Sequence, residues 1–118
     1  MADERWIPVL SSGEVAPGAV VPVSVGTLDL AVWRTAGGVL AASDARCPHQ
    51  WSHLAGAGAV DGEELVCLSH FWRFDTDGHG SKVSVKGRRD PKGDVATYPV
   101  REAEGRIEVW VPDTPSAT

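Results

Sequence analysis

The sequence contains two short motifs that each combine one cysteine with one histidine. The first is Cys47-Pro48-His49, and the second, after a link of seventeen residues, is Cys67-Leu68-Ser69-His70. The chain has no other cysteine. Thiolates and imidazoles together suit zinc, copper and iron–sulfur centres, so the motifs predict a metal centre built from two loops. The link is long enough for two short strands and a turn, which would bring the loop tips together.

The ligand set narrows the kind of metal centre. One Cys and one His from each loop is the arrangement of a Rieske [2Fe-2S] centre, in which two thiolates hold one iron and two imidazoles hold the other. Replacing two thiolates with neutral imidazoles removes two negative charges, so the reduction potential rises above that of a four-thiolate cluster. We therefore predict one Rieske-type 2Fe-2S cluster, with metal and cofactor ligands Cys47, His49, Cys67 and His70.

Other interpretations of the same residues stand beside this one. A zinc site can also use two Cys and two His, but common zinc modules pair C-x2-4-C with a later H-x3-5-H. The sequence has no C-x2-4-C, and the H-x3-H pair of His49 and His53 precedes the second cysteine. A disulfide between Cys47 and Cys67 is disfavoured in a reducing compartment. A packing role suits His53 and His79 better than it suits the motif histidines.

Length and composition indicate one ordinary globular domain. The 118 residues are 42% apolar and 23% charged, which predicts a single domain over 1–118, with a cluster-binding part at about 45–75 and a mobile tail at 112–118. No apolar run approaches the ~20 residues of a membrane span, and the N-terminus lacks the features of a signal peptide. We expect a cytoplasmic protein with no membrane partner. The net charge of -5 argues against nucleic-acid binding.

Short apolar segments separated by glycine and proline predict an all-β fold, as a small antiparallel sandwich or barrel. No segment supports a helix of ten or more residues. Pro8 favours an edge position for the first strand, and Ser11 with Glu14 has the spacing of a capping box. Residues 81–96 have little periodicity and predict an exposed connection. The expected strands are residues 6–10, 20–25, 28–34, 39–42, 59–60, 64–66, 71–74, 97–101 and 106–111.

Residues throughout the chain follow the pattern of a known family. They are Cys47-Pro48-His49-Gln50, Gly58, Gly62, Cys67-x-x-His70-x-Trp72-x-Phe74, Gly78-His79-Gly80, Tyr98-Pro99-Val100 and the closing strand at 107–111. Over about residues 5–111 the chain resembles Rieske ferredoxins. It is most similar to the ferredoxin component of multicomponent diiron monooxygenases that oxidise toluene, alkenes or isoprene. Phe71 departs from the pattern, because many Rieske proteins place glycine after the ligand histidine.

The resemblance implies the Rieske iron–sulfur fold and an electron carrier that is not an enzyme alone. Such a monomer would take single electrons from an NAD(P)H-dependent flavin reductase and pass them to the diiron hydroxylase of a monooxygenase. The chain has no G-x-G-x-x-G nucleotide fingerprint and, beyond the motifs, only two histidines for a mononuclear iron site. Two alternatives stay open: the ferredoxin of a Rieske ring-hydroxylating dioxygenase, and a redox-sensing or zinc-binding module.

Charge and aromatic residues predict where a partner would dock. The imidazole-bound iron should face the surface, so we expect docking at the loop tips, near Trp51, His53 and Phe71, beside the acidic turn at 61–64. Residues 82–92 hold five of the eleven basic residues and one acid, a local charge of +4 that leaves -9 on the rest of the chain. We expect this basic stretch to be a solvated loop, with a docking role as the opposite possibility. An acidic body would raise association rates with basic partner faces.

Overall fold

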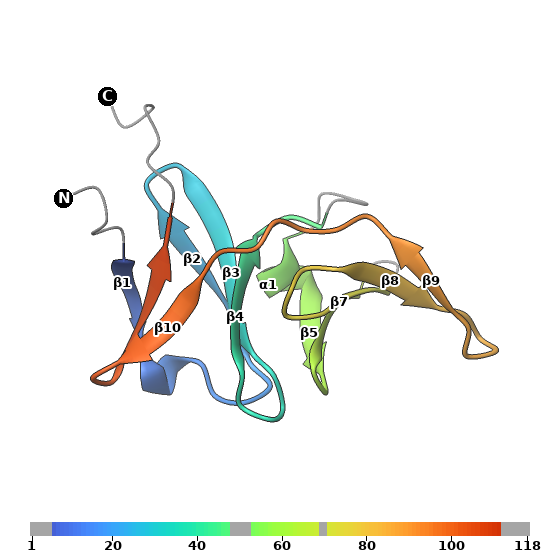
Figure 1. Cartoon of the computed structure of the whole chain (residues 1–118), viewed down its shortest axis with the longest axis horizontal. Coiled ribbons are helices and arrows are strands. Elements are labelled where there is room, and N and C mark those ends of the chain that lie inside the picture. Colours follow the sequence, from blue (N-terminus) through green and yellow to red (C-terminus); the bar gives the residue numbers. More distant parts are fainter. Residues whose placement is uncertain (1–5, 48–52, 69–70, 112–118) are drawn as a thin grey trace.

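A computed structural model describes residues 6–47, 53–68 and 71–111 (Figure 1). In these ranges eleven short strands follow one another with two helical turns between them. The elements are β1 (Trp6–Ser11), η1 (Ser12–Glu14), β2 (Val20–Val25), β3 (Leu28–Arg34), β4 (Leu40–Asp44), α1 (Leu54–Ala57), β5 (Gly58–Asp61), β6 (Glu64–Cys67), β7 (Trp72–Phe74), β8 (Gly80–Val83), β9 (Arg89–Lys92), β10 (Val100–Ala103) and β11 (Arg106–Trp110).

The described strands form three antiparallel sheets. Their orders are β1-β11-β10, β2-β3-β4 and β5-β6-β7-β8-β9. The longest described helix has four residues, so the expected all-β fold is confirmed. None of these helices is long and apolar enough to cross a bilayer.

The two three-stranded sheets share one core, which we call the sandwich core. Leu30 and Val32 of β3 meet Ile107 and Val109 of β11 there, all at 0% exposure. Leu28 packs against the same core, so Leu28, Leu30 and Val32 share one face of β3. Successive side chains of a strand point to opposite faces, which explains why the whole run from 30 to 33 is buried.

The other face of β3 belongs to a second core, which we call the thiol core. Ala31 and Trp33 lie in it together with both cysteines and with residues of the five-stranded sheet. In Figure 1 this sheet extends to the side of the molecule opposite β1 and β10. The members of the thiol core are Ala31, Trp33, Ala41, Cys47, Leu54, Leu65, Cys67, Phe74 and Val95.

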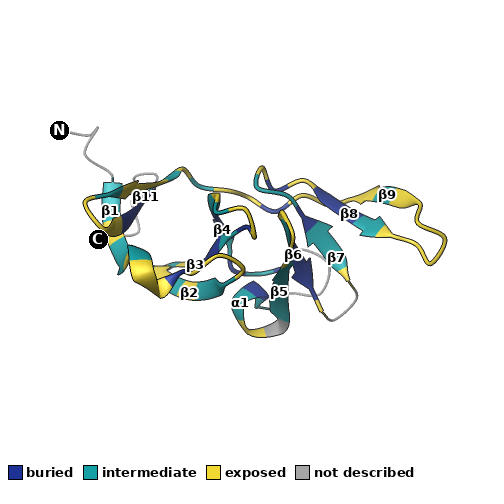
Figure 2. Ribbon diagram, turned by 90° about the horizontal axis from the view of Figure 1, so that it is seen from below, coloured by how far each residue is buried: buried dark blue, intermediate teal, exposed yellow. Residues whose placement is uncertain are grey.

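Residues 81–96 are mostly exposed, as expected, but the expectation of a connection without strands is wrong. This stretch contains most of β8 and all of β9, which pair as a hairpin from Gly80↔Lys92 to Val83↔Arg89. Most of its side chains are exposed (Figure 2), so no alternation of apolar and polar residues marks the strands. Pro91 lies in β9, the edge strand of the sheet, where a missing N–H is tolerated.

Two local predictions near the N-terminus are confirmed. The strand that contains Pro8 is at a sheet edge. The carboxylate of Glu14 accepts hydrogen bonds from the N–H of Ser11 at 2.8 Å and from its hydroxyl at 3.0 Å. This contact closes the turn η1 that leads the chain from β1 towards β2.

Candidate metal centre

Cys47 lies at the start of a loop whose base is closed by backbone pairing. The N–H of Leu54 donates to the carbonyl of Ala45 at 2.6 Å, and Arg46 and His53 form an antiparallel bridge. The described residues before and after the segment 48–52 therefore lie side by side. His49 is in this segment and lies outside the described residues.

Cys67 is the last residue of β6, an interior strand of the five-stranded sheet. It is paired with Gly58 on one side and with Trp72 on the other. The N–H of Phe71 donates to the Cys67 carbonyl at 2.7 Å, which closes the second loop directly after the cysteine. His70 is in this second loop and also lies outside the described residues.

Both cysteines are buried in the thiol core, at 0% and 1% exposure. Neither forms a disulfide, so the disulfide alternative is not what the structure shows. Two thiols brought into one core at the bases of two closed loops are the donors that half of a Rieske centre requires. Within the described ranges no three His, Cys, Asp or Glu residues group as metal ligands. The residues present therefore fit the cysteine half of the predicted site.

Gly58 allows the two loops to approach. A Cβ at this position would lie 2.2 Å from the carbonyl oxygen of Leu54 and 3.0 Å from that of Val66. Because both neighbours are backbone atoms, neither can move aside without shifting α1 or β6. A residue without a side chain is thus required opposite Cys67, which gives a physical reason for this glycine in the pattern.

Phe71 has a backbone conformation that suits glycine. Its φ is 64°, in the left-handed region that side chains with a Cβ disfavour. The departure from the family pattern therefore changes the residue while the glycine-like backbone stays. The ring of Phe71 is 57% exposed and Leu68, at the other end of the loop, is 51% exposed, so apolar surface flanks the second loop on both sides.

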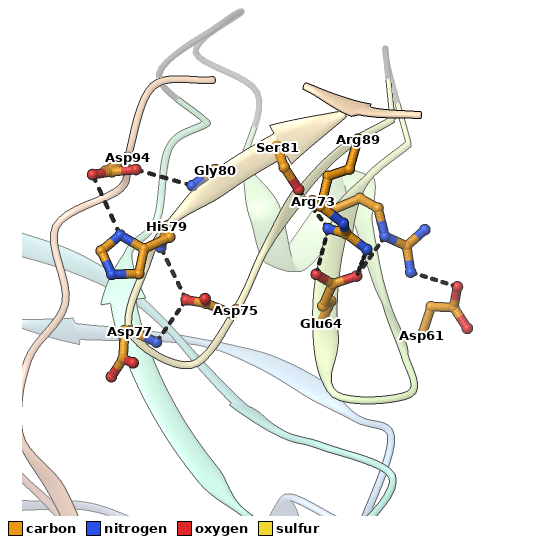
Figure 3. A network of polar contacts seen from close by, with 10 residues as sticks. All are labelled: Asp61, Glu64, Arg73, Asp75, Asp77, His79, Gly80, Ser81, Arg89 and Asp94. Carbon is orange, nitrogen blue, oxygen red and sulfur yellow. Dashed lines mark hydrogen bonds and ion pairs between the residues drawn. The ribbon is translucent and has the colours of Figure 1, made fainter. Parts of the chain in front are cut away.

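The two remaining histidines have other contacts. Nδ1 of His53 accepts a hydrogen bond from the N–H of Ala55 at 3.1 Å and caps α1, which agrees with a structural role. His79 is exposed, and its Nδ1 lies 3.6 Å from Asp94, so the expected packing role is wrong for this residue. The backbone N–H of His79 donates to the carboxylate of Asp75 within the turn before β8 (Figure 3).

A chain of ion pairs runs across the five-stranded sheet from β5 to β9 (Figure 3). Arg73 donates to Glu64 and to Asp61, each at 2.7 Å, and Arg89 donates to Glu64 at 2.8 Å and to Ser81 at 2.6 Å. Partial burial by itself would raise the pKa of Glu64, but the hydrogen bonds from both arginines outweigh it and the pKa is lowered. The same contacts with Asp61 and Glu64 raise the pKa of Arg73.

Tyr98 makes a contact that sequence reasoning did not find. Its hydroxyl donates to the carboxylate of Asp44 at 2.6 Å. Burial, and then this carboxylate, raise the pKa of Tyr98 to about 12. Asp44 also lines a cavity of about 440 Å³ beside the segment that leads to Cys47. Tyr98-Pro99-Val100 was part of the family pattern, but nothing in the sequence indicated a partner 54 residues away.

Two of the three tryptophans considered near the site, Trp33 and Trp72, are among the described residues. Trp33 is 2% exposed and packs in the thiol core. Trp72 is half-buried and packs against the thiol core, where it can cover the region of the cysteines. Trp51 lies outside the described residues.

A family model for the Rieske [2Fe-2S] domain matches residues 5–99. Among curated proteins, the chain is 36% identical over 117 residues to a 4beta-methylsterol monooxygenase of Methylococcus capsulatus, covering 96% of this chain and 31% of that protein. It is 32% identical over 105 residues to cholesterol 7-desaturase nvd 1 of Ciona intestinalis, covering 89% of this chain and 22% of that protein. The chain thus spans less than a third of these curated relatives.

Solved structures show the same fold. Apo dicamba monooxygenase superposes with a TM-score of 0.80 at 25% identity, over 100% of this chain and 36% of that one. A chain from the complex of reduced oxygenase and oxidised ferredoxin in carbazole 1,9a-dioxygenase superposes with a TM-score of 0.74 at 25% identity. That match covers 94% of this chain and 97% of the other, so the same fold also occurs there as a chain of similar extent.

Proposed function

The chain belongs to the Rieske [2Fe-2S] domain family, and on that basis we propose that it carries single electrons between a reductase and an oxygenase. The family indicates one Rieske-type 2Fe-2S cluster and the role of an electron-carrier module. The cluster, when bound, accepts and releases one electron. The observation that carries the proposal is the pair of thiols buried together in the thiol core at the bases of two loops.

We assign four ligands to the cluster. Cys47 and Cys67 would hold one iron, and His49 and His70, from the same two loops, would hold the other. The protein around the thiols excludes water, since both are at most 1% exposed. Half-buried Trp72 covers the thiol core from the start of β7. Metal binding requires deprotonated thiols, so loading the site would release protons.

The acceptor in this proposal is the hydroxylase of a diiron monooxygenase, as the resemblance in the sequence implies. An NAD(P)H-dependent reductase would be the donor, and the chain itself would be a cytoplasmic monomer without catalytic residues. We also propose that residues 1–118 form a single domain. One observation favours a second candidate, the ferredoxin of a Rieske dioxygenase, because a chain of the carbazole 1,9a-dioxygenase complex is matched over 97% of its length.

The cluster is tested on protein purified without air. The expected result is a red-brown protein with two irons and two acid-labile sulfides per chain, oxidised and reduced reversibly by one electron. Cys67→Ala should lose the cluster because a ligand is gone, whereas His70→Cys should keep a cluster with altered visible bands. Gly56→Ala is the matched control, since a Cβ there meets nothing within 4 Å. Stoichiometric zinc without visible bands would contradict the proposal.

The acceptor is tested by reconstitution. The reduced protein is mixed with a diiron hydroxylase or with a Rieske dioxygenase, and the product formed per electron is measured. Turnover with only the diiron enzyme supports the first candidate, and turnover with only the dioxygenase supports the second. Product formed by this chain alone would contradict the assignment as a carrier.

A further inference from the structure

We propose that the basic hairpin, residues 80–92, is a docking arm that binds an acidic face of the electron-transfer partner. The inference rests on the proposed function and names the chemistry of the partner's surface. The hairpin consists of β8, β9 and the turn at 84–88. It projects from the body of the molecule in both views (Figures 1 and 2).

Strand register puts the hairpin tip at the same end of the sheet as the second ligand loop. β6 runs towards Cys67 and the loop at 68–71, and β8 is parallel to β6 because β7 is antiparallel to both. Cys67 faces Trp72, and the next residue pair, Arg73↔Ser81, puts Lys82 level with Trp72. The tip at Val85 extends three residues, roughly 10 Å, beyond that level. A protein that covers the loop therefore reaches the tip as well.

The hairpin has exposed apolar residues at and next to its tip, and lysines from its base at Lys92 to its turn at Lys86. Val85 is fully exposed, and Val83 is 37% exposed. Lys82, Lys86 and Lys92 form no ion pair with any described residue. Leu68 and Phe71 expose further apolar surface at the same end of the sheet. Small apolar contacts within a charged rim are typical of interfaces that form transiently.

The hairpin is held in place although it is exposed. The N–H of Ser84 donates to the Arg88 carbonyl and the N–H of Gly87 to the Ser84 carbonyl, each at 2.8 Å. Gly87 has a φ of 86°, which glycine adopts without strain. Directly after the turn, the ion pair of Arg89 with Glu64 ties the start of β9 to β6. An arm ordered before binding loses less conformational entropy on docking than a loose loop would.

The acidic turn at 61–64 is in the wrong place to be the docking face. Asp61↔Glu64 is the pair farthest from Gly58↔Cys67 in the β5–β6 hairpin, which puts the turn about 10 Å from the cysteine end. Asp61 and Glu64 are also engaged by Arg73, and the Glu63 carboxylate accepts from the N–H of Gly37 at 3.0 Å. These contacts give all three carboxylates a role within the fold. The charged side chains left to meet a partner near the second ligand loop are therefore the basic ones of the hairpin.

The charge pattern favours an acidic protein over a polyanion. The hairpin's local charge of +4 is attached to a remainder of -9. Nucleic acid or an anionic membrane extends far beyond one hairpin, so either would meet the repulsive body as well. A protein with a confined acidic patch can contact the tip and the second ligand loop alone.

The first test measures oxidation of the reduced protein by hexacyanoferrate(III), an anion, and by tris(phenanthroline)cobalt(III), a cation. Lys86→Glu should lower the second-order rate constant with the anion about threefold at 10 mM ionic strength and raise that with the cation, and both effects should fade in 0.5 M salt. Arg106→Glu makes the same change in net charge at the exposed first residue of β11, in another sheet. Equal effects of the two variants would overturn the inference.

The second test measures binding, independently of electron transfer. A hexaglutamate peptide is titrated into the isotope-labelled protein, and the expected result is amide shifts confined to residues 82–92 that are lost in Lys86→Glu. Tighter binding of a DNA duplex or of phosphatidylglycerol vesicles at the hairpin would overturn the acidic protein as partner. If the protein lacks the visible bands of a cluster, or reacts with neither oxidant, the proposed function fails, whereas the peptide titration still tests the hairpin.

Discussion

At the scale of single residues, Gly58 controls how closely α1 approaches β6, the strand that carries Cys67. Gly58→Ala places a Cβ 2.2 Å from the Leu54 carbonyl oxygen, which forces α1 and β5 apart. We expect the purified variant to hold less than half of the wild-type iron and to melt several degrees lower, since overpacking typically costs about 1–3 kcal/mol. Iron content and thermal melting measure the two effects.

Gly56→Ala is the control for that substitution. It adds the same methyl group two residues away, inside α1, where a Cβ meets nothing within 4 Å. Alanine is the better helix former, so this variant should keep its iron and melt at the wild-type temperature or slightly above. Equal iron loss in both variants would show that a helix effect, and not the contact with the Leu54 carbonyl, is responsible.

Tyr98 makes the stability depend on pH in the alkaline range. Tyr98→Phe removes the hydrogen bond to Asp44, and bonds to charged groups typically contribute about 1.5 kcal/mol or more. We expect the free energy of unfolding in urea at pH 7 to fall by about that amount. Asp44→Asn, which keeps an acceptor without the charge, should lose less. An unchanged unfolding midpoint in Tyr98→Phe would contradict the contact.

The direction of the pH effect follows from the raised pKa of Tyr98. The folded pKa is about 12 against 10.0 for an ordinary tyrosine, so the folded state keeps the phenol proton that the unfolded state releases. The stabilisation is complete below pH 10 and is lost as the pH rises from about 10 to about 12. The stability of wild type should therefore fall over this window more steeply than that of Tyr98→Phe.

At the scale of elements, the β10–β11 turn contains avoidable strain. Glu104 and Gly105 connect the pair Ala103↔Arg106, and their φ values are 54° and 79°. A two-residue hairpin turn with both φ values positive prefers Asn-Gly. Glu104→Asn should raise the free energy of unfolding by about 0.5–1 kcal/mol, measured by urea denaturation. Glu104→Ala removes the same charge without relieving the strain and should give no gain.

The elements also show which structure the sequence could predict. β3 was predictable because Leu28, Leu30 and Val32 alternate with residues that face the other way. β9 was not, since Arg-Asp-Pro-Lys has no apolar alternation and is held by pairing with β8 and by the Arg89–Glu64 ion pair. Strand pairing between exposed residues leaves no periodic signal, because neither face of the hairpin packs in a core.

The candidate site likewise has a part that the sequence could predict and a part that depends on the fold. Cysteine and histidine are chemically rare and specific, so the sequence indicated Cys47 and Cys67 directly. That the two thiols share one core with Trp33 and Phe74 depends on contacts between distant segments, which no local pattern encodes. The predicted position of the acidic turn beside the ligand loops was wrong for the same reason. The turn at 61–64 is near Cys67 in sequence but lies at the opposite end of the β5–β6 hairpin.

At the scale of the whole molecule, the two cores predict two different responses to loss of the metal. The thiol core contains both cysteines, whereas the sandwich core contains neither. Metal binding contributes directly to the stability of the region that supplies the ligands. Removing it should therefore loosen β5, β6 and β7, while β11 and the face of β3 that points into the sandwich core keep their packing.

Hydrogen exchange on protein with and without the cluster measures this response. We expect the amides of Leu65 and Phe74 to exchange at least about tenfold faster without the cluster, and those of Ile107 and Val109 to change little. Cys67→Ala, which removes a proposed cluster ligand, should reproduce the pattern without chelator. Because β3 presents Ala31 and Trp33 to one core and Leu30 and Val32 to the other, its amides should lose protection by an intermediate factor. If Ile107 and Val109 lost protection as fully as Leu65, the two cores would unfold as one cooperative unit, and β3 would be the element that couples them.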